Sequence, residues 1–417
     1  IQPEEPSPVT LSLRMAWRNL WRHKRRTWLT ATAMIFSNVL LVFMISLQFG
    51  SYEMMIGNTL KAFSGNLQIQ AEGYQDNPKL RTSIPAVTDL ADRVRTQIPG
   101  AHVTARAAGF ALASSEQRSF GIQVIGVQPL HEPNVTSLPG LVREGRYLAD
   151  SNAAEIVIGS VMARNLKVQP GDEITLLGSG RDGSFAAGIV TVAGVFETGM
   201  PDMDRGFAHL GLAYFQDTFA MGNHGNSVVV ALDSIDDTPA AVQTARALIQ
   251  DVNEWVVLDW ETLNPGLKQA IMADLSSAWF MYAVLIVLVA FSVLNTQLMS
   301  VLERTREFGV ITALGIRPRK LASLVMLETA LMASIGMAIG MFLGWLVALY
   351  FNTVGFSYPG MEELAARFNM PGKMYPSVSL FAMMLGPTVV FLFCLLASVY
   401  PALRLFRLNP VEAMSAA

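Results

Sequence analysis

Four stretches of the chain are apolar over lengths that match the thickness of a bilayer. They cover 28–49, 278–302, 321–351 and 379–403, and Glu328 is the one charged residue within them. A helix needs about 20 residues to cross the hydrocarbon core, and a soluble core built by a chain of this size has little room for four such runs. The pattern therefore predicts four membrane helices, over 28–52, 276–302, 321–351 and 378–403.

Lysine and arginine gather in three clusters outside these runs. The clusters precede the first run, separate the second from the third and follow the fourth. Four crossings bring all three to one face of the membrane, and cytoplasmic loops carry the excess of positive charge. We therefore expect both termini and the tail 404–417 in the cytoplasm, with 53–275 and the loop 352–377 outside. The clusters are Arg14, Arg18, Arg22, Lys24, Arg25 and Arg26; Arg304, Arg306, Arg317, Arg319 and Lys320; and Arg404 and Arg407.

The stretch 11–27 has a pattern of its own. Leu13, Trp17, Leu20 and Trp21 interleave with the arginines of the first cluster. An amphipathic basic helix with tryptophans is typical of a segment that lies along the membrane surface. We expect an interfacial helix here, with an ordinary positively charged flank as the alternative.

The polar segment between the first two membrane helices alternates strand-like and helix-like patterns. The expected fold is an α-helical membrane protein with four transmembrane helices and a large α+β domain over 53–275, between helices 1 and 2. Residues 53–127 and 227–262 form one part of that domain, and the turn-rich block 128–226 is a β-rich insert. The patterns predict strands over 66–70, 103–114, 119–127, 227–232 and 254–258, and helices over 88–98 and 238–250.

The membrane runs contain a few residues that stand out. Gly336, Gly340 and Gly344 form a ladder on one face of the third helix, and such ladders let helix backbones approach closely. The ladder fits packing within the chain and packing against a second copy equally well. Asn38 is expected to hydrogen-bond between helices. For Glu328 we expect pairing with Arg317, Arg319 and Lys320 or snorkelling, with a role in transport as the alternative.

Composition agrees with a membrane protein that has a sizeable polar part. The chain has 417 residues, of which 52% are hydrophobic and 15% charged, with a mean hydropathy of +0.37. Soluble domains carry about 25% charged residues. The net charge of −3 gives no basic field for nucleic acid, so we expect no nucleic-acid partner. Cys394 is a single cysteine, so no disulfide forms within the chain.

Motifs that carry chemistry are missing from the sequence. There is no GxxxxGK[ST] phosphate loop, no HExxH and no GxSxG. Five histidines are scattered, and Gly178 to Gly183 is expected to form a hairpin turn. Asp202 and Asp204 are expected in a loop between strands rather than at a metal. We expect no enzymatic activity and no cofactor or metal in this chain.

Two stretches carry a resemblance to a known family. Residues 303–321 read ERTREFGVITALGIRPRKL, and 401–414 read PALRLFRLNPVEAM. In the outer segment, EIVIGSVMARNLKVQPGDEITL (155–176) and TVAGVFETGMPDMDRGFAHLGL (191–212) are similar to stretches of the same family. The chain resembles FtsX/MacB/Lol-type (type VII) ABC transporter permeases, and among them the lipoprotein-releasing, LolC/LolE-like members. The matching loop residues are Arg304, Arg306, Glu307, Gly309, Ala313, Leu314 and Gly315, and those of the tail are Pro401, Ala402, Pro410, Glu412 and Ala413.

The resemblance implies how such a protein works. It implies a permease of the bacterial inner membrane, acting with a cytoplasmic ABC ATPase dimer that binds ATP and Mg, and with a second permease copy, identical or paralogous. ATP-driven closure then moves the outer, periplasmic domains, a mechanism called mechanotransmission. The outer parts correspond to the family's Porter-like (53–127, 227–262) and Sabre-like (128–226) subdomains.

The resemblance also assigns the loop 303–320 as the helix that docks into the ATPase. Arg304 and Arg306 are expected to meet acidic groups of the ATPase groove. Apolar contact is expected from Phe308, Val310 and Ile311, and Gly315 and Pro318 end the helix.

The cargo stays open at this point. The motif at 191–212 favours extraction of lipoproteins or a similar amphiphile from the outer leaflet. The interval 177–189 is short where chaperone-recruiting members carry a long hook, so recruitment of a periplasmic partner is open. The alternatives are a MacB-like export motor with an adaptor and outer-membrane channel, and an FtsX-like signalling permease that carries nothing.

Overall fold

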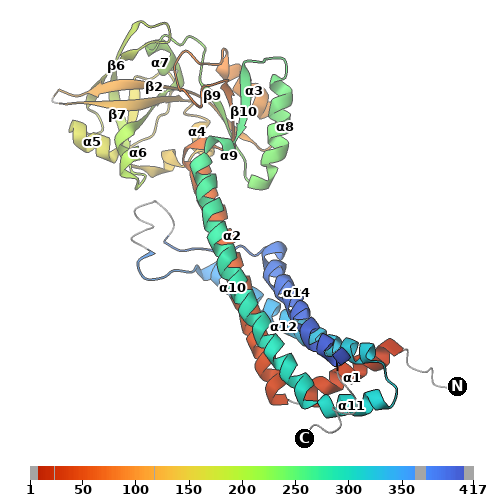
Figure 1. The fold of residues 1–417 in the computed structure, drawn as a ribbon. Coiled ribbons are helices and arrows are strands. Elements are labelled where there is room, and N and C mark those ends of the chain that lie inside the picture. Colours follow the sequence, from red (N-terminus) through yellow and green to blue (C-terminus); the bar gives the residue numbers. More distant parts are fainter. Residues whose placement is uncertain (1–7, 23, 117, 362–371, 408–417) are drawn as a thin grey trace, which may run out of the picture. The chain divides into compact units, whose positions relative to one another are not determined.

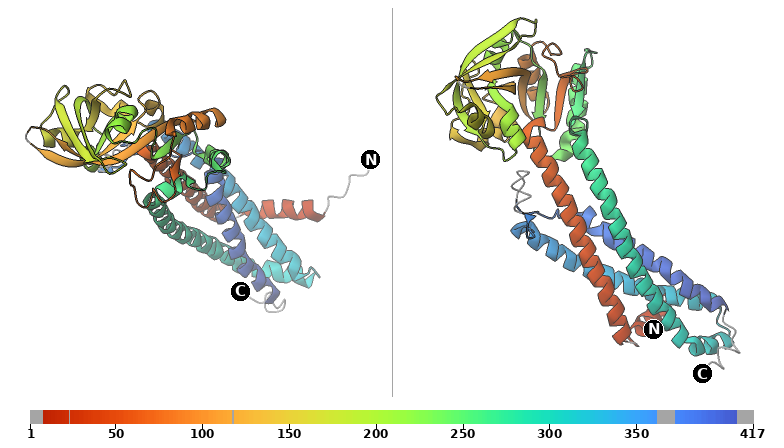
Figure 2. Two further views of the ribbon diagram at one scale, coloured as in Figure 1. Left: turned by 90° about the horizontal axis from the view of Figure 1, so that it is seen from above. Right: turned by 60° about the vertical axis from the view of Figure 1, so that its left-hand side comes forward.

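The structure of the chain, a computed structural model, describes residues 8–22, 24–116, 118–361 and 372–407. The chain separates into two units (Figures 1 and 2). The membrane unit consists of 1–53, 271–358 and 373–417, and the outer unit consists of 54–270 and 359–372. The residues Pro410, Glu412 and Ala413 of the tail motif lie outside the described residues.

Four long apolar helices form where the hydropathy pattern predicts them. Within the described residues, four helices are long and apolar enough to span a bilayer. They are α2 (Lys24–Thr59), α10 (Pro265–Glu303), α12 (Pro318–Val354) and α14 (Leu380–Arg404). Two shorter helices, α1 (Pro8–Arg22) and α11 (Thr305–Ala313), precede α2 and α12, and η4 (Leu405–Arg407) follows α14. The predicted set of membrane helices is confirmed.

The helix ends differ from the apolar runs. Helix α2 continues to Thr59 and α10 begins at Pro265, so both extend beyond the apolar runs. At the other end, α1 stops at Arg22 and α2 begins at Lys24. Lys24 to Thr27, expected in the interfacial helix, therefore form the first turn of α2.

A buried cluster holds the membrane unit together. Helices α12 and α14 lie side by side (Figures 1 and 2), and α1 joins the cluster through Leu20. Its members come from α1, α2, α10, α12 and α14: Leu20, Met34, Leu41, Ile45, Tyr282, Ile286, Val289, Val293, Met332, Ala333, Ala382, Val390 and Cys394.

One sheet organises the outer unit. Among the described residues its order is β10-β1-β9-β2-β3-β8-β5-β7-β4, with β6 paired to β2 and β7. The strands and helices that the sequence predicts here are confirmed, with ends shifted by at most one residue. The strands are β1 (Leu67–Ala71), β2 (His102–Ser114), β3 (Ser119–Val127), β4 (Val142–Gly145), β5 (Glu155–Gly159), β6 (Glu173–Ser179), β7 (Phe185–Phe196), β8 (Phe207–Gly211), β9 (Ser227–Ala231) and β10 (Trp255–Asp259).

The order of strands reflects the inserted block. Strands β10, β1, β9, β2 and β3 come from the two ends of the segment and are neighbours, and β8, β5, β7 and β4 follow from 128–226. Strands β3 and β8 pair in parallel, from Gln123↔Phe207 to Val127↔Gly211. One buried cluster extends through both groups of strands. The insert therefore continues the sheet of its host instead of forming a sheet of its own.

Short helices cover the sheet and join its strands. Helices α3 and α8 contact each other and pack on the strands β2, β9, β1 and β10 (Figure 1). The helical segments of the outer unit are η1 (Leu60–Ser64), α3 (Val87–Gln97), α4 (Glu132–Val135), η2 (Leu138–Leu141), α5 (Ser160–Leu166), α6 (Pro201–Gly206), α7 (Leu212–Thr218), η3 (Ile235–Asp237), α8 (Thr238–Ile249) and α9 (Trp260–Leu263).

Candidate coupling site

The basic loop between α10 and α12 folds as a short helix with a turn at each end. Arg304 leaves the helical conformation after Glu303 (φ −98°, ψ 8°), and α11 runs from Thr305 to Ala313. Gly315 has a φ of +92°, where a residue with a Cβ is strained. Pro318 stands in the first turn of α12, where its missing N–H costs no helical hydrogen bond. Gly315 thus stands at the turn after α11, as expected, whereas Pro318 begins α12 and does not end the loop helix.

One face of α11 is turned into the protein. Phe308 is 1% exposed, and Gly309 beside it is buried. Phe308 was expected to contact an ATPase, but it lies inside the chain's own core and offers no surface to a partner. The cluster around it joins the ends of α10, α12 and α14 through Val301, Leu321, Ala322, Val325, Ala402 and Leu405.

The opposite face of α11 is exposed. Three exposed residues, Arg306, Val310 and Ala313, lie three or four positions apart on α11, as neighbours on one side of a helix do. Leu314 and Arg317 are also exposed and follow the end of α11 at Ala313. Leu314 is the most exposed of the apolar ones at 79%, and Val310 is 45% exposed. We call these five residues the outer face of α11. It combines an apolar centre with arginines at both ends.

Arg304 points inward and pairs with the charged residue of the third membrane run. Its Nη1 lies 3.1 Å from both carboxylate oxygens of Glu328, and its guanidinium stands 4.9 Å from the ring centre of Phe308. Asn19 of α1 donates a second hydrogen bond to Glu328 Oε1, 2.7 Å long. The side chains of Arg304 and Glu328 are 11% and 9% exposed. Arg304 is therefore engaged within the chain.

The pairing of Glu328 is as predicted, but with a different cation. Arg317, Arg319 and Lys320 lie eight or more residues before Glu328, which places them about 12 Å or more away along the axis of α12. Arg304, in contrast, comes from the loop before α11 and reaches back to the same depth. Asn19, which the sequence did not single out, completes the arrangement.

Glu307 connects α11 to α1. Its carboxylate lies 2.8 Å from Nη2 of Arg22 and 3.5 Å from Nε of Arg304. Both Arg22 and Glu307 are substantially exposed, at 58% and 42%, and exposed ion pairs contribute about 0–1 kcal/mol. This pair therefore orients α11 against α1 more than it stabilises the fold.

Two tryptophans of α1 and one of α2 are in mutual contact. The ring centres of Trp17 and Trp21 are 6.0 Å apart, and those of Trp21 and Trp28 are 6.2 Å apart, both edge to face. Trp17, Trp21 and Trp28 are 37–55% exposed. Exposed tryptophans beside arginines are typical of a helix at the membrane surface, and the interfacial position of α1 stays a prediction.

A small polar cavity lies beside the Arg304–Glu328 pair. It has a volume of 30 Å³ and includes Asn19, Thr296, Gln297 and Ser300 in its lining. A cavity of this size holds about one water molecule. It therefore has no room for a cargo, and the polar groups around it join α1, α10 and α12.

The glycine ladder of α12 packs within the chain. A Cβ on Gly340 would stand 2.5 Å from the Cβ of Asn38, and a Cβ on Gly344 would stand 2.8 Å from that of Val42. Gly336 meets Met34 in the same way, at 2.9 Å. Residues 34, 38 and 42 form one face of α2, so the ladder is the groove in which α2 lies. Asn38 is buried there, and its Oδ1 has no hydrogen-bond partner among the described residues.

One of the two acidic residues at 202 and 204 has a structural role. Asp202 and Asp204 lie in helix α6, not in the expected loop. Asp204 is buried and accepts hydrogen bonds from the backbone N (2.9 Å) and Oγ1 (2.7 Å) of Thr198. Within the described part of the chain, no group of His, Cys, Asp and Glu is placed to hold a metal ion. The predicted turn at Gly178 to Gly183 is confirmed as the end of the β6–β7 hairpin.

Two family models match the chain. Residues 27–248 match the MacB-like periplasmic core domain, and residues 279–410 match the FtsX-like permease C-terminal domain. The first match covers nearly all of α2 and most of the outer unit. The second covers most of α10, together with α11, α12 and α14.

Curated relatives are similar at low identity. The lipoprotein-releasing system transmembrane protein LolC of Xylella fastidiosa is 25% identical over 69% of this chain and 71% of its own. LolE of Haemophilus influenzae is 26% identical over 70% and 72%. The pyoverdine export ATP-binding/permease protein PvdT of Pseudomonas fluorescens is 23% identical over 97% of this chain, which spans 59% of that protein.

Solved structures with similarity are outer domains. The extracellular domain of the noncanonic ABC-type transporter YknZ from Gram-positive bacteria aligns with 46% of this chain and 99% of its own, at 19% identity and a TM-score of 0.35. The periplasmic region of MacB from Actinobacillus actinomycetemcomitans aligns with 51% and 98%, at 14% identity and a TM-score of 0.37.

Proposed function

The chain belongs to the MacB-like periplasmic core domain family, and from this premise we propose that it is the subunit through which a separate ATPase moves the outer unit. It is a multi-pass membrane permease of the ABC type. In the proposal, the outer face of α11 docks into a cytoplasmic ABC ATPase dimer that binds the ATP and Mg. The protein sits in the bacterial inner membrane with both termini in the cytoplasm, and a second permease copy completes the complex.

The two-faced structure of α11 carries this proposal. The outer face of α11 brings the exposed Leu314 and Val310 together between two arginines, and an apolar patch with a polar rim is typical of an interaction site. The arginines at either end suit an acidic groove. The inner face, held by Phe308 and the Arg304–Glu328 pair, provides the rigid seat that a transmitted displacement requires.

The chain's own residues then pass the displacement on. The Arg304–Glu328 pair connects α11 to α12, and Asn19 and Arg22 connect α11 and α12 to α1. Helices α2 and α10 are continuous from the membrane unit into the outer unit, so they are the route by which motion reaches the outer sheet. No cargo passes through the membrane unit in this mechanism.

Reconstitution tests the coupling role. The full chain is purified from native membranes with the ATPase that accompanies it and placed in lipid nanodiscs. We expect Arg306→Glu, which reverses the charge at the exposed end of the outer face, to lower ATPase stimulation at least about tenfold while insertion is unchanged. Full stimulation in that variant would contradict the docking face.

For the cargo we propose lipoproteins or similar amphiphiles, extracted from the outer leaflet. The support is the similarity to LolC and LolE over about 70% of the chain, together with the motif at 191–212. The short β6–β7 hairpin offers no long hook, so the proposal does not include a chaperone recruited there. Mass spectrometry of acylated proteins bound to the purified complex tests it, and normal lipoprotein localisation after depletion of the chain would refute it.

A second candidate is an export motor acting with a periplasmic adaptor and an outer-membrane channel. It is favoured by the similarity to pyoverdine export permeases, which extends over 97% of the chain. The two candidate functions predict different binding partners for the outer unit. Crosslinking in whole cells captures an adaptor in the second case, and in the first it captures acylated protein without one.

A further inference from the structure

The first membrane helix, α2, ends in a short π-helical segment, η1. The last carbonyls of a helix have no partner within it and must be satisfied from outside. Here three of them receive donors from three different elements. Lys61 O accepts from the backbone N of Ser137 (2.7 Å), Phe63 O from Nη1 of Arg106 (2.6 Å), and Ser64 O from Nε2 of Gln68 (2.8 Å).

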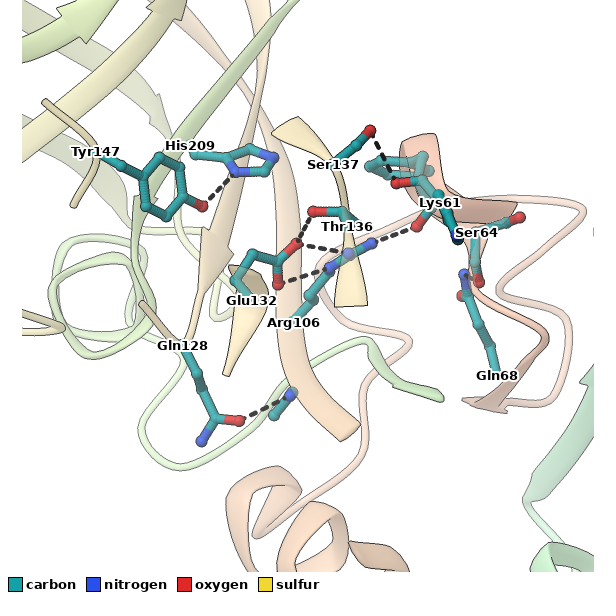
Figure 3. Close-up of polar contacts among 12 residues, drawn as sticks. Lys61, Ser64, Gln68, Arg106, Gln128, Glu132, Thr136, Ser137, Tyr147 and His209 are labelled. Carbon is teal, nitrogen blue, oxygen red and sulfur yellow. Dashed lines mark hydrogen bonds and ion pairs between the residues drawn. The ribbon is translucent and has the colours of Figure 1, made fainter. Parts of the chain in front are cut away.

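Arg106 is the charged member of this set. It lies on β2, and Figure 3 shows its guanidinium between the end of the helix and the carboxylate of Glu132 on α4. Nη2 of Arg106 donates to Glu132 Oε1 at 2.6 Å and Nε donates to Oε2 at 3.3 Å. The guanidinium also stands 5.1 Å from the ring centre of Phe63. One side chain thus holds both the helix end and a carboxylate.

The ion pair is fully inside the protein. The side chains of Arg106 and Glu132 are 3% and 0% exposed, and Thr136 Oγ1 donates a third hydrogen bond to Glu132 Oε1 at 3.1 Å. Burial raises the pKa of Glu132, but the charge of Arg106 and these hydrogen bonds outweigh it, so the pKa lies below its usual value. The carboxylate therefore stays charged and keeps Arg106 oriented.

The position of Arg106 in the sheet connects the end of α2 to a central strand. Strand β2 lies in the interior of the sheet order, between β9 and β3. It pairs with β3 from Arg106↔Val127 onwards and with β9 at Arg106↔Ser227. A displacement of η1 would therefore be applied to the centre of the sheet. The second membrane helix is attached nearby, because Asn264, just before α10, donates to Ser64 Oγ at 3.2 Å.

We propose that Arg106, oriented by Glu132, is the positioning residue through which displacement of the first membrane helix is passed to the centre of the outer sheet. The inference rests on the proposed function, because it assumes that α2 moves when the partner ATPase closes. A helix cap that merely completes hydrogen bonds needs no buried charge. A guanidinium that grips the helix end, a carboxylate and an aromatic ring together resists both pulling and rotation.

The test compares Arg106→Lys with a matched variant. Lysine keeps the charge and the stem but lacks the planar fork, so it cannot bind Glu132 and Phe63 O at once. The control is Arg95→Lys on α3. Arg95 also bridges a carboxylate and a backbone carbonyl, Asp92 (2.5 Å) and Val103 O (2.8 Å), but it does not touch η1. Both variants are studied as the full chain in nanodiscs with the co-purifying ATPase.

Hydrogen–deuterium exchange gives two separate measurements. Without nucleotide, we expect amides of 60–68 to exchange at least about tenfold faster in Arg106→Lys than in the wild type, and to be unchanged in Arg95→Lys. With ATP and vanadate, we expect the exchange of 102–110 to change in the wild type and in Arg95→Lys but not in Arg106→Lys. Peptides from 303–320 should be protected by the ATPase in all three.

Each result decides a different point. Unchanged exchange of 60–68 in Arg106→Lys would show that Arg106 does not hold the end of α2, whatever the ATPase activity is. A normal vanadate response at 102–110 in that variant would overturn transmission through Arg106. Absence of protection at 303–320 in the wild type would instead reject the proposed function, while the result at 60–68 still decides whether Arg106 holds the helix end.

Discussion

At the scale of single residues, the buried charges of this protein connect elements far apart in the sequence. Glu328 joins α12 to the loop before α11 and to α1, and Glu132 joins α4 to β2. A buried charge destabilises the fold unless it is paired. Removing one partner leaves the other as an unpaired buried charge, which lowers the free energy of unfolding. We therefore expect substitutions at these positions to lower stability even when they remove only the charge and keep the side-chain volume.

The Arg304–Glu328 pair gives the first prediction. Glu328→Gln keeps the shape of the side chain but removes the charge that compensates Arg304, so we expect a loss of about 1–3 kcal/mol of stability. Glu307→Gln is the matched control, because Glu307 is 42% exposed and its pair with Arg22 contributes about 0–1 kcal/mol. Denaturant titration of the detergent-solubilised chain measures both. Equal effects in the two variants would argue against a buried pair.

His209 gives a prediction about pH. Burial holds the pKa of His209 at about 4, below its ordinary 6.5, and Nδ1 lies 2.9 Å from the hydroxyl of Tyr147 (Figure 3). The unfolded chain binds a proton between pH 6.5 and 4 that the folded chain does not, so stability falls as pH falls through this window. The loss is roughly 3 kcal/mol across the window.

The substitution His209→Gln removes this titration. We expect it to flatten the fall in stability between pH 6.5 and 4, measured as the urea midpoint for proteolysis of the outer unit. A wild-type chain equally stable at pH 6.5 and 4.5 would contradict the assignment.

At the scale of elements, the glycine ladder of α12 is the clearest case of close packing. Gly340 leaves no space for a side chain, because a Cβ there would stand 2.5 Å from that of Asn38 and 3.0 Å from Ile35 O. Gly340→Val should therefore force α2 and α12 apart and lower the melting temperature and the yield of folded protein. Gly57→Ala on α2 is the control, since nothing lies within 4 Å of a Cβ there. Fluorescence-detected gel filtration after heating compares them.

Elements with a local pattern could be predicted from the sequence. The strands β2 and β3 have strand-like patterns of apolar and polar residues and flank a short turn. The four membrane helices are recognised by their length and hydropathy. Both kinds of element can therefore be predicted from residues close together in the sequence. The sheet order could not be predicted, because the parallel pairing of β3 with β8 joins residues that no local pattern relates.

The site was predictable in part for the same reason. The sequence indicates that Glu328 needs a cation, but five basic residues stand in the same loop and only the turn at Arg304 selects among them. The motif residues of α11 also gave no indication of which face is buried. Phe308 and Leu314 are both apolar residues of this segment, and the sequence does not distinguish them. Phe308 is buried and Leu314 is exposed, because Ala402 of α14 and Leu405 of η4 pack on the side of Phe308.

At the scale of the whole molecule, the packing within one chain limits how it assembles. The ladder of Gly336, Gly340 and Gly344 is occupied by α2, so it is not the surface on which a second permease copy packs. A second copy, if the proposed complex forms, packs on other helix faces, such as the exposed apolar side of α10. In the proposed docking, the outer face of α11 is the apolar surface offered to the ATPase.

Leu314 therefore gives the most direct test of the proposed docking. It is 79% exposed, so Leu314→Asp costs the isolated chain little, but a charge at the centre of an apolar contact should abolish docking. We expect ATPase stimulation to fall at least about tenfold, with insertion and melting temperature as in the wild type. Phe308→Ala should behave in the opposite way, with a loss of about 3–5 kcal/mol of stability, because Phe308 is a core residue.

The control for Leu314 is a leucine of equal exposure elsewhere. Leu130 in the outer unit is 80% exposed, so Leu130→Asp introduces the same charge on the same kind of surface without touching α11. It should leave ATPase stimulation intact. If Leu314→Asp and Leu130→Asp behave alike, the exposed stripe on α11 is an ordinary surface and force must enter the chain elsewhere. If only Leu314→Asp uncouples the ATPase, the contact lies on the outer face and the buried Arg304–Glu328 pair behind it is the first step by which motion reaches α12.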